Sequence, residues 1–370
     1  MKANAALMWE QPGKFTVHEV DLDEPGAGEV LVELKASGLC HSDYHMVTGD
    51  TPLNHFPYCA GHEGGGIVRK VGPGVTALKE GDHIVTTFVP SCGRCKWCAL
   101  GMQNLCDYGA LILEGTQLDG GYRMHVDGRD VATAAMLGTF ADWQVMDQAS
   151  CVKVRDDVPL DVACLVGCGV PTGFGSAARA AEIKPGDVVV IAGVGGVGMN
   201  AVQGAKAAGA RRIIVVDPAP FKREIAPTFG ATDVFDNMAD AISLAKSLTN
   251  GQGADSAIVT VGVITGQDIT DGFNAIRKAG TVAVTGQGTM GVHPVDIDLF
   301  EISMYQKRIQ GVLYGTGSPQ EIIPTLLDMY VDGKLKLDEL VTRRYSLDRI
   351  NEAYQDMVDG KNIRGVIQYA

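Results

Sequence analysis

The stretch "KPGDVVVIAGVGGVGMNAVQGAKAAGARRIIVVD", residues 184–217, carries the clearest structural signal in the chain. Its apolar run at 188–192 predicts a buried parallel strand, the glycines after it predict a turn, and the small residues of 199–208 predict a helix. A second apolar run, 212–216, ends in Asp217. This order of strand, turn, helix and strand predicts a βαβ unit.

The glycines of this turn fit the G-x-G-x-x-G pattern, which allows a tight turn, close approach of a pyrophosphate to the backbone, and contact between helix and strand. The helix that follows offers an anion site at its N-terminus. Asp217 lies nineteen residues beyond the last motif glycine, where a carboxylate can meet the adenosine ribose; the alternative is an acid that only ends a strand. Because a carboxylate there repels a 2′-phosphate, the sequence favours NAD over NADP. The residues expected to form the turn are Gly193, Gly195, Gly196, Val197 and Gly198.

Further strands are expected on the C-terminal side of this unit, with helical stretches between them, at 233–235, 257–261, 281–285 and 309–314. The alternation predicts an α/β domain with a doubly wound parallel sheet, the Rossmann arrangement. A length of 370 residues also favours two domains over one.

Composition and charge limit the class of partner. The chain is 46% hydrophobic and 20% charged, as in ordinary globular proteins. Its net charge of −13 argues against nucleic acid or an anionic membrane surface as partner. The N-terminal apolar run is short and is broken by Glu10 and Pro12, and the uncharged run 188–205 contains five glycines. We therefore expect a cytoplasmic protein.

Four of the nine cysteines lie within fifteen residues, beginning with "CGRCKWC" at 92–98. In a reducing compartment, clustered cysteines indicate a metal site rather than disulfides. Their spacing, C-x2-C-x2-C-x7-C, lets four thiolates surround one tetrahedral ion and predicts a closed, structural zinc site. Four unrelated buried thiols are the alternative. The predicted ligands are Cys92, Cys95, Cys98 and Cys106.

Three dispersed motifs indicate a second metal site: "GLCHSDYH" at 38–45, "GHEGGG" at 61–66 and "GCGVPTGFGSA" at 167–177. Two thiolates and one imidazole from separate segments would leave a fourth position of a zinc ion open, which is typical of catalytic zinc. Taken singly, each of these residues could be a buried thiol or a satisfied polar group.

The order and spacing of all these motifs resemble the zinc-dependent alcohol dehydrogenases of the medium-chain dehydrogenase family. The resemblance covers nearly the whole chain, including the C-terminal "GKNIRGVIQYA". Within the family, "FVPSCGRCKWC", "LVGCGVPTGFGSA" and "YQDMVDGKNIRGVI" are most similar to the actinobacterial nicotinoprotein group, which holds NAD tightly and passes electrons to dimethylnitrosoaniline in assays.

The resemblance implies a mainly β, GroES-like catalytic domain at residues 1–169 and 315–370, with a zinc lobe at about 88–108. A Rossmann NAD-binding domain at 170–314 would lie between the two catalytic segments. In the family, the late strand pairs sheets across a two-fold axis, so a homodimer or homotetramer is expected.

The resemblance also assigns the catalytic zinc. Cys40, His62 and Cys168 would be its ligands, with Glu63 beside it as a transient ligand. Asp43 would hold the ring of His62 from behind.

Proton transfer and substrate contact fall to four further residues by resemblance. Ser42 would accept the proton of the alcohol and pass it through the ribose to His45 near solvent. Phe88 and Phe140 would wall the substrate pocket. The alternatives are a serine that bonds the local backbone, an exposed histidine without a relay role, and two core phenylalanines.

Three residues match cofactor contacts of the family. Arg364 would meet the pyrophosphate, Lys222 would help Asp217 to hold the adenosine ribose, and Thr172 would lie under the nicotinamide. His41 replaces an arginine that is common in relatives, and Gln287 replaces an apolar pocket residue. The insert around 110–135 has no clear counterpart.

The resemblance implies an NAD-dependent oxidoreductase with two zinc ions per chain. Zinc acts as a Lewis acid on the alcohol, and the alkoxide then passes hydride to NAD, which gives an aldehyde or ketone. The NAD would be non-exchangeable, so a second substrate or electron acceptor would reoxidise it. The alternatives are a thiol-adduct formaldehyde dehydrogenase with exchangeable NAD and a non-catalytic NAD- or zinc-binding protein.

Overall fold

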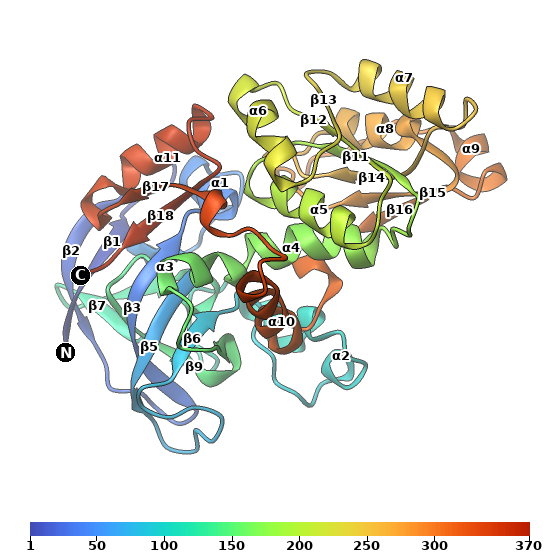
Figure 1. The fold of residues 1–370 in the computed structure, drawn as a ribbon. Helices are drawn as coiled ribbons and strands as arrows, with labels where there is room; N and C mark the ends of the chain where they lie inside the picture. The colour runs from blue at the N-terminus through green and yellow to red at the C-terminus, as the bar shows by residue number, and fades with distance from the viewer. The chain divides into compact units, whose positions relative to one another are not determined.

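The computed structural model describes all 370 residues, which form two compact units (Figure 1). One unit comprises residues 1–168 and 317–370 and is built mainly of strands. The other comprises residues 169–316 and alternates strands with helices. This confirms the predicted fold class.

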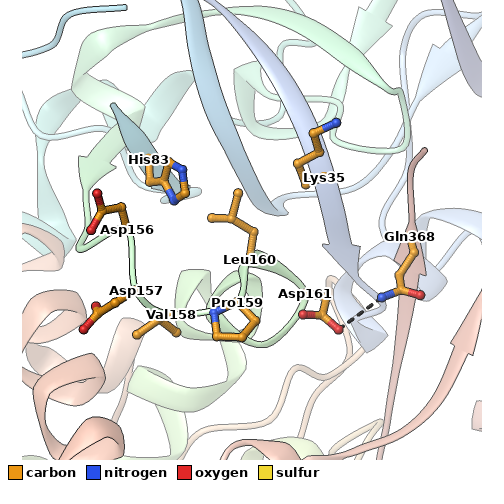
Figure 2. Close-up of a pocket in the computed structure, with 9 residues that line it drawn as sticks. All are labelled: Lys35, His83, Asp156, Asp157, Val158, Pro159, Leu160, Asp161 and Gln368. Atoms are coloured by element: carbon orange, nitrogen blue, oxygen red, sulfur yellow. Dashed lines mark hydrogen bonds between the residues drawn. The ribbon is translucent and has the colours of Figure 1, made fainter. Parts of the chain in front are cut away.

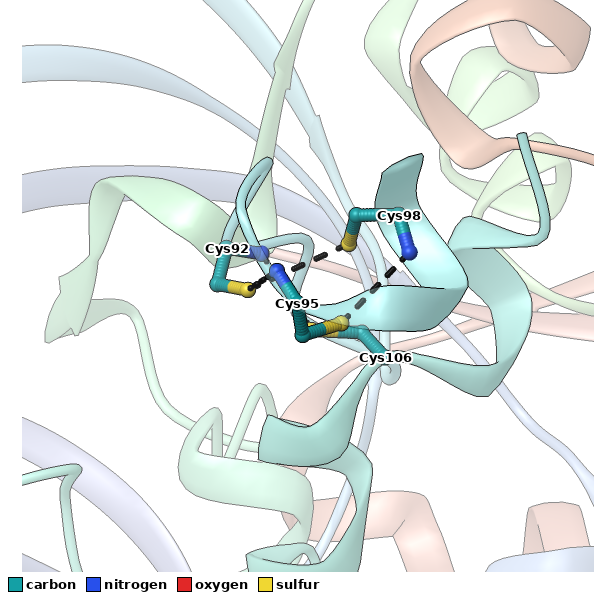
Figure 3. A group of neighbouring side chains, drawn as sticks. All are labelled: Cys92, Cys95, Cys98 and Cys106. Atoms are coloured by element: carbon teal, nitrogen blue, oxygen red, sulfur yellow. Dashed lines mark hydrogen bonds between the residues drawn. The ribbon is translucent and has the colours of Figure 1, made fainter. Parts of the chain in front are cut away.

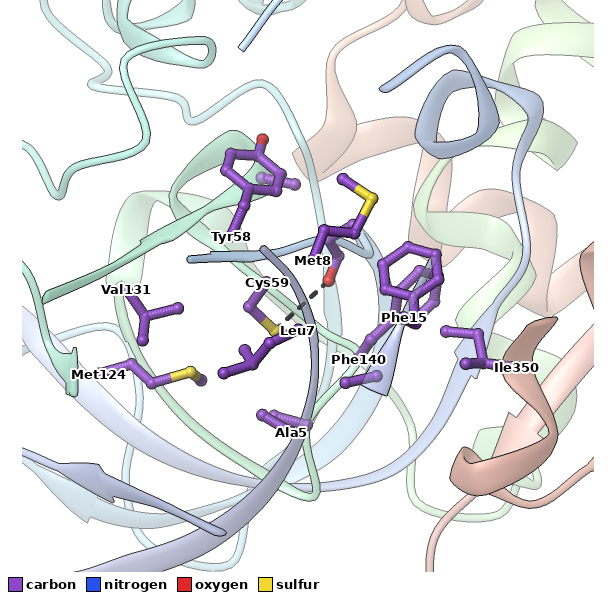
Figure 4. Packing of buried hydrophobic residues seen from close by; sticks show 14 of the residues in the cluster. Ala5, Leu7, Met8, Phe15, Tyr58, Cys59, Met124, Val131, Phe140 and Ile350 are labelled. Carbon is purple, nitrogen blue, oxygen red and sulfur yellow. Dashed lines mark hydrogen bonds between the residues drawn. The ribbon is translucent and has the colours of Figure 1, made fainter. Parts of the chain in front are cut away.

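A closed barrel forms one part of the mainly β unit. Its strands, in barrel order, are β1 (Lys2–Met8), β2 (Thr16–Leu22), β7 (Met124–Val126), β8 (Arg129–Thr133) and β4 (Tyr58–Cys59). Figure 4 shows the core of this barrel, where Leu7, Phe15 and Phe140 are packed with Ile350 from α11 (Ile350–Val358). Each such side chain contributes about 1.5–3 kcal/mol by leaving water.

A seven-stranded sheet forms the rest of this unit. Its order is β10 (Cys151–Lys153), β6 (His83–Thr86), β5 (Glu63–Val71), β3 (Glu29–Gly38), β18 (Arg364–Gln368) and β17 (Val341–Tyr345), with β9 (Trp143–Asp147) also paired to β3. Strands β3 and β5 are antiparallel with Gly38 opposite Glu63, and β18 places Val366 opposite Gly38 on the other side. This register places the start of β5 and the start of β18 on either side of the end of β3.

The insert that the sequence left unaligned supplies two barrel strands, β7 and β8. They are joined by Asp127 and Gly128, whose φ angles of 49° and 73° are both left-handed. Such a pair suits a two-residue hairpin turn, for which Asp-Gly is a common sequence.

The helices of the mainly β unit are short, apart from one near the C-terminus. They are α1 (His41–Thr48), α2 (Lys96–Ala99), α3 (Leu160–Ala163), α10 (Pro319–Val331) and α11. Single 3₁₀ turns lie at Gln103–Leu105, Asp107–Leu111, Ala134–Met136, Gln148–Ser150, Cys164–Gly167, Asp338–Leu340 and Leu347–Arg349.

The α/β unit contains a parallel sheet of six strands. Its order is β13 (Asp233–Phe235), β12 (Arg212–Val216), β11 (Val188–Ala192), β14 (Ala254–Val259), β15 (Ile276–Val284) and β16 (Arg308–Gly311). Numbered along the chain, this order is 3-2-1-4-5-6, the arrangement of a Rossmann fold. Its helices are α4 (Gly169–Gly175), α5 (Gly196–Ala207), α6 (Pro220–Phe229), α7 (Met238–Leu248), α8 (Gly266–Ala275) and α9 (Leu299–Met304), with a π-helical turn at Ser176–Ala180.

Some predicted boundaries in this unit are wrong. The helix after the glycine turn begins at Gly196 rather than 199, and the strands expected at 257–261 and 281–285 are β14 and β15, which begin earlier. The strand expected at 309–314 ends at Gly311. Tyr314, Gly315 and Thr316 have φ angles of 55°, 63° and 58°, which no extended strand accommodates.

No single helix of the chain has the length and apolar character needed to cross a membrane. One bent pair of short helical segments, 160–167 and 169–180, meets the criteria by length and composition alone.

Candidate metal centres and dinucleotide site

The four sulfurs of the cysteine lobe lie within 4.8 Å of one another (Figure 3). The loop itself directs peptide N–H groups at them: Cys92 N–H donates to Cys106 Sγ at 3.3 Å, and Cys95 N–H donates to Cys92 Sγ at 3.3 Å. Cys98 N–H donates to Cys95 Sγ at 3.5 Å, where Cys95 caps helix α2. Four sulfur donors without an open position fit a structural zinc ion.

The lobe favours ionisation of Cys95 over that of Cys98 and Cys106. The N–H groups of Cys98 and Asp107 lower the pKa of Cys95 to about 6. Burial raises the pKa of Cys98 to about 12 and also raises the pKa of Cys106. Because zinc binds thiolates, Cys95 is better prepared for the ion than Cys98 or Cys106 in the metal-free lobe.

A second cluster brings together Cys40, His62, Glu63 and Cys168, whose ligand atoms also lie within 4.8 Å of one another. Cys40 occupies the N-cap position of α1 just after β3, and His62 directly precedes β5, so the pairing of β3 with β5 places the two side by side. Cys168 follows Gly167, at which a Cβ would lie 2.6 Å from the carbonyl oxygen of Thr86 and 3.5 Å from Cα of Glu63. Close backbone packing therefore brings the third segment to the cluster.

Glu63 of this cluster also forms a buried ion pair with Arg364. Arg364 Nη2 donates to Glu63 Oε2 and, at 3.0 Å, to the carbonyl oxygen of Leu39. A Cβ at Gly38 would overlap the Glu63 carboxylate, so a side chain there would displace the carboxylate from its present position. Burial raises the pKa of Glu63 to about 7, although Arg364 opposes the rise. Sequence reasoning missed the role of Gly38.

Asp43 lies against the imidazole of His62 and the backbone before it. Its Oδ1 accepts the N–H of Gly61 at 2.9 Å and lies 3.2 Å from His62 Nδ1. Burial alone would lower the pKa of His62, but Asp43 and Cys40 raise it well above its usual value. A carboxylate behind a histidine fixes the ring so that its other nitrogen can meet a metal.

The two thiols of this cluster differ in acidity. The Cys168 thiol, and then the ring of His62, hold the pKa of Cys40 well below its usual range. The pKa of Cys168 is raised well above its usual range by Cys40 and by burial. Two sulfurs, one imidazole nitrogen and one adjacent carboxylate fit a zinc ion with an exchangeable position.

The residues predicted for proton transfer lie on α1, but His45 is not near solvent. Ser42 Oγ lies 3.7 Å from Cys40 Sγ. Only 2% of His45 is exposed, and its Nδ1 lies 3.4 Å from Asp50 Oδ2, whose side chain is 29% exposed. The expected exposure of His45 is wrong, because Gly49, with a φ of 93°, ends the helix and turns the chain back over His45.

The two phenylalanines predicted for the substrate pocket lie in different places. The ring of Phe88 meets the ring of His62 edge-on, with centroids 5.6 Å apart. Phe140 is fully buried in the barrel core and meets Phe15 edge-on at 5.7 Å. Phe88 therefore borders the ligand cluster, whereas Phe140 packs behind it against Gly61.

The glycine turn has the geometry that its motif requires. Gly193 has a φ of 84°, which is left-handed, and a Cβ at Gly198 would overlap the carbonyl oxygen of Gly193. A Cβ at Gly195 would meet no atom within 4 Å, so the backbone there is open to a ligand. Helix α5 begins at the next residue and presents its N-terminal N–H groups on that side.

Asp217 lies at the end of β12 and is 3% exposed. Its Oδ2 accepts the N–H of Val194 at 2.9 Å and lies 3.8 Å from Lys222 Nζ. The buried Oγ1 of Thr172 has no hydrogen-bond partner. Sequence reasoning missed Arg223, which donates to the carbonyl oxygen of Asp217 at 2.7 Å.

A separate pocket of about 460 Å³ shares no residue with either cysteine cluster (Figure 2). Two of its carboxylates are already paired: Asp157 with Arg155, and Asp161 with Gln368 and Arg344. The pocket is lined by Lys35, His83, Asp156, Asp157, Val158, Pro159, Leu160, Asp161 and Gln368.

Comparisons with known proteins cover the whole chain. Residues 26–156 match the family model of the alcohol dehydrogenase GroES-like domain, and residues 196–332 match that of the zinc-binding dehydrogenase. The NDMA-dependent alcohol dehydrogenase of Amycolatopsis methanolica is 48% identical over 370 residues, 100% of both chains. Alcohol dehydrogenase B of Mycobacterium tuberculosis is 46% identical over 100% of this chain and 99% of its own. The crystal structure of benzyl alcohol dehydrogenase from Acinetobacter calcoaceticus superposes with a TM-score of 0.93 and 31% identity over 100% of both chains.

Proposed function

This chain belongs to the zinc-dependent alcohol dehydrogenases of the medium-chain dehydrogenase family, close to the actinobacterial nicotinoproteins, and we propose that it oxidises primary alcohols with an NAD that stays bound between turnovers. The observation that carries this proposal is the buried cluster of Cys40, His62 and Cys168 with Glu63 beside it. The primary alcohol is proposed because a relative of known structure acts on benzyl alcohol.

We propose two zinc ions per chain. Cys40, His62 and Cys168 would hold the catalytic one, and the four cysteines of the lobe would hold the structural one. When bound in the first site, zinc supplies a Lewis acid that makes an alcohol far more acidic than it is in water. The chemistry of both donor sets supports this assignment, because one set is closed and the other leaves room for an oxygen ligand.

The chain's own residues position the reactants and move the proton. Asp43 holds the ring of His62 in one orientation. Ser42 would take the proton of the alcohol, and His45 would receive it in turn. Asp50 is the more exposed partner of His45, so it would connect this path to water. Phe88 would border the substrate, because its ring lies against His62.

The glycine turn and Asp217 would hold NAD, which accepts hydride when bound. Lys222 would assist Asp217 at the ribose, and Thr172 would contact the nicotinamide through its unpartnered hydroxyl. Arg364 would meet the pyrophosphate, since its buried Nε has no partner within the protein. Similarity to an NDMA-dependent enzyme supports retention of the cofactor and reoxidation by a second substrate.

We further propose that the enzyme works in the cytoplasm as a homodimer or homotetramer. Strand β16 lies at the edge of its sheet and is exposed along its whole length. Leu299, Phe300 and Met304 on α9 are 60–78% exposed. An unpaired edge beside exposed apolar side chains favours pairing with a second copy.

Metal analysis and cofactor release test the proposed function. Purified enzyme should contain two zinc ions per chain, release NAD(H) when denatured, and oxidise benzyl alcohol with dimethylnitrosoaniline as acceptor but without added NAD. One zinc ion per chain would contradict the catalytic site. If denatured enzyme releases no NAD(H) and turnover needs added NAD, the proposal that NAD stays bound is contradicted. If turnover strictly requires formaldehyde together with a thiol carrier, the thiol-adduct enzyme is favoured instead.

A further inference from the structure

Arg223 holds the backbone turn that carries Asp217. Strand β12 ends at Val216 and α6 begins at Pro220, so only three residues connect them. From the first turn of α6, Arg223 Nη1 donates to the carbonyl oxygens of Asp217 at 2.7 Å and of Pro218 at 2.8 Å. One side chain therefore binds two successive carbonyl oxygens of this short connection.

The Asp217 carboxylate depends on the position of this backbone. Its Oδ1 accepts the N–H of Ala219 at 2.9 Å, and its Oδ2 accepts the N–H of Val194 in the glycine turn at 2.9 Å. The carboxylate thus joins the glycine turn to the start of α6. Ala219, the N-cap residue of α6, has no side chain that can cap the helix. The Asp217 carboxylate instead bonds the start of the helix by accepting the N–H of Ala219.

We propose that Arg223 is a positioning residue for the adenosine half of the dinucleotide: it fixes the backbone at Asp217 and Pro218 so that the Asp217 carboxylate meets the ribose hydroxyls. This inference rests on the proposed function only in taking the glycine turn as a dinucleotide site. It makes Arg223 a determinant of how long the cofactor stays bound.

The chemistry of the arginine suits this role better than that of a lysine. Both hydrogen bonds come from Nη1, whose two N–H groups are held in the plane of the guanidinium, whereas the three N–H groups of an ammonium rotate on a flexible stem. Lys222 lies 3.8 Å from the Asp217 carboxylate itself, so the two cations act on different parts of the same residue. Lys222 balances the side-chain charge, and Arg223 holds the main chain.

The test is the affinity of the full-length protein for ADP-ribose, which lacks the nicotinamide. Two quantities are measured: the half-life of NAD(H) on the purified enzyme during dialysis, and the dissociation constant of ADP-ribose by calorimetry once the site has emptied. Arg223→Met should weaken ADP-ribose binding about 10- to 100-fold, because charge-assisted hydrogen bonds are lost. Arg223→Lys should weaken it by about 3- to 10-fold, and the NAD(H) half-life should fall in the same order.

Arg211→Met is the matched control, since Arg211 in the same unit also donates to a carbonyl oxygen, that of Leu248 at 3.3 Å. Its ADP-ribose affinity should stay within about twofold of the wild type. The decisive comparison uses Asp217→Ala. If Arg223 acts through Asp217, adding Arg223→Met to Asp217→Ala should weaken binding no further.

An independent, additive loss in the double variant would overturn the inference, and so would unchanged binding in Arg223→Met. If Arg223→Met does not fold, Arg223→Lys replaces it in the same cycle. Wild-type protein that binds ADP-ribose but oxidises no alcohol would contradict the proposed function and leave the inference intact. Wild-type protein that does not bind ADP-ribose would overturn both.

Discussion

The ligand atoms of each cysteine cluster lie within 4.8 Å of one another, but the two clusters are assembled by different means. In the lobe, four cysteines lie within fifteen residues, and peptide N–H groups of the same loop bond their sulfurs. In the second cluster, Cys40 and Cys168 are 128 positions apart, and side chains from other elements, Asp43 and Arg364, surround the ligands. A local cluster can stabilise its own loop, whereas a dispersed cluster requires the fold before it can exist.

The two clusters also differ in what lowers the pKa of their most acidic thiol. Backbone N–H groups lower the pKa of Cys95, whereas another thiol and an imidazole lower the pKa of Cys40. The lobe therefore prepares its thiolate with fixed dipoles, and the second cluster does so with groups that are themselves metal ligands. In the lobe the neighbouring thiols act on Cys95 less than the peptide groups do, whereas in the second cluster a ligand thiol is the largest cause, so the two sites should respond differently to mutation.

The largest expected effect is the loss of turnover when a ligand of the second cluster is removed. His62→Ala and Cys40→Ser should each reduce turnover by roughly 10³-fold or more, because the Lewis acid contributes several kcal/mol to the barrier. Zinc content should fall from two ions per chain to one, and circular dichroism should remain that of the folded protein. Retention of both zinc ions with full activity would exclude the assigned ligands.

The second-largest expected effect is a loss of stability when a cysteine of the lobe is replaced. Cys92→Ser should remove the lobe zinc and lower the free energy of unfolding by several kcal/mol, since binding energy at a structural zinc site is folding energy. A melting temperature lower by about 2–4 °C per kcal/mol is expected for a unit of this size. Turnover per folded molecule should stay close to that of the wild type. If Cys92→Ser abolishes turnover without a change in melting temperature, the roles of the two clusters have been assigned the wrong way round.

A smaller effect concerns Glu63 in zinc-free protein. Burial raises the pKa of this carboxyl to about 7 from an ordinary value of 4.5. A raised pKa in the folded state means that the folded protein binds more protons than the unfolded one, so the contribution of Glu63 is present below about pH 4.5 and is lost as the pH rises through about 7. The difference amounts to about 3 kcal/mol across that range.

Denaturant unfolding of zinc-free wild type and Glu63→Gln at pH 5 and pH 8 measures this contribution. Glutamine cannot ionise but still accepts a hydrogen bond from Arg364, so the variant should lose less stability than the wild type between the two pH values. An identical loss in both proteins would show that the pair with Arg364 keeps Glu63 ionised throughout.

The local cluster could be predicted from the sequence by itself, whereas the dispersed cluster could not. The spacing of Cys92 to Cys106 was enough to predict the lobe, because all of its ligands are local. The β11–α5–β12 unit was predictable for the same reason, since strand, glycine turn and helix follow one another in the chain. The second cluster depended on resemblance to a family, because only the register of β3 with β5 brings Cys40 beside His62.

Features that depend on how the chain turns back on itself were not predicted. His45 was expected near solvent, but its exposure depends on the left-handed Gly49 that places Asp50 over it. The Asp127-Gly128 hairpin had a usable signal in its sequence, yet its strands have few residues and unclear periodicity. The bonds of Arg223 to the turn before it could not be predicted, because a surface arginine on a helix usually has no assigned partner.

The smallest expected effect is on the reactivity of thiols, and its first comparison, between two cysteines of the lobe, needs no mutation. In metal-free protein, iodoacetamide should modify Cys95 first, with a rate that rises through about pH 6, because the Cys95 thiol ionises there and is only half-buried. Cys98, with a pKa raised to about 12, should be far slower at the same pH. Mass spectrometry of peptides after short exposure at pH 5, 6, 7 and 8 measures both rates.

Cys40 provides the contrast, since the pKa of its thiol is also held low. Its charge depends on the Cys168 thiol and on His62, so His62→Ala should slow the modification of Cys40 and leave that of Cys95 unchanged. In the lobe, the donors are peptide groups that no side-chain substitution at position 62 can remove. If His62→Ala slowed the modification of both cysteines equally, the low pKa of Cys95 and that of Cys40 would have the same origin. The distinction between peptide N–H groups in the lobe and side chains in the second cluster would then be wrong.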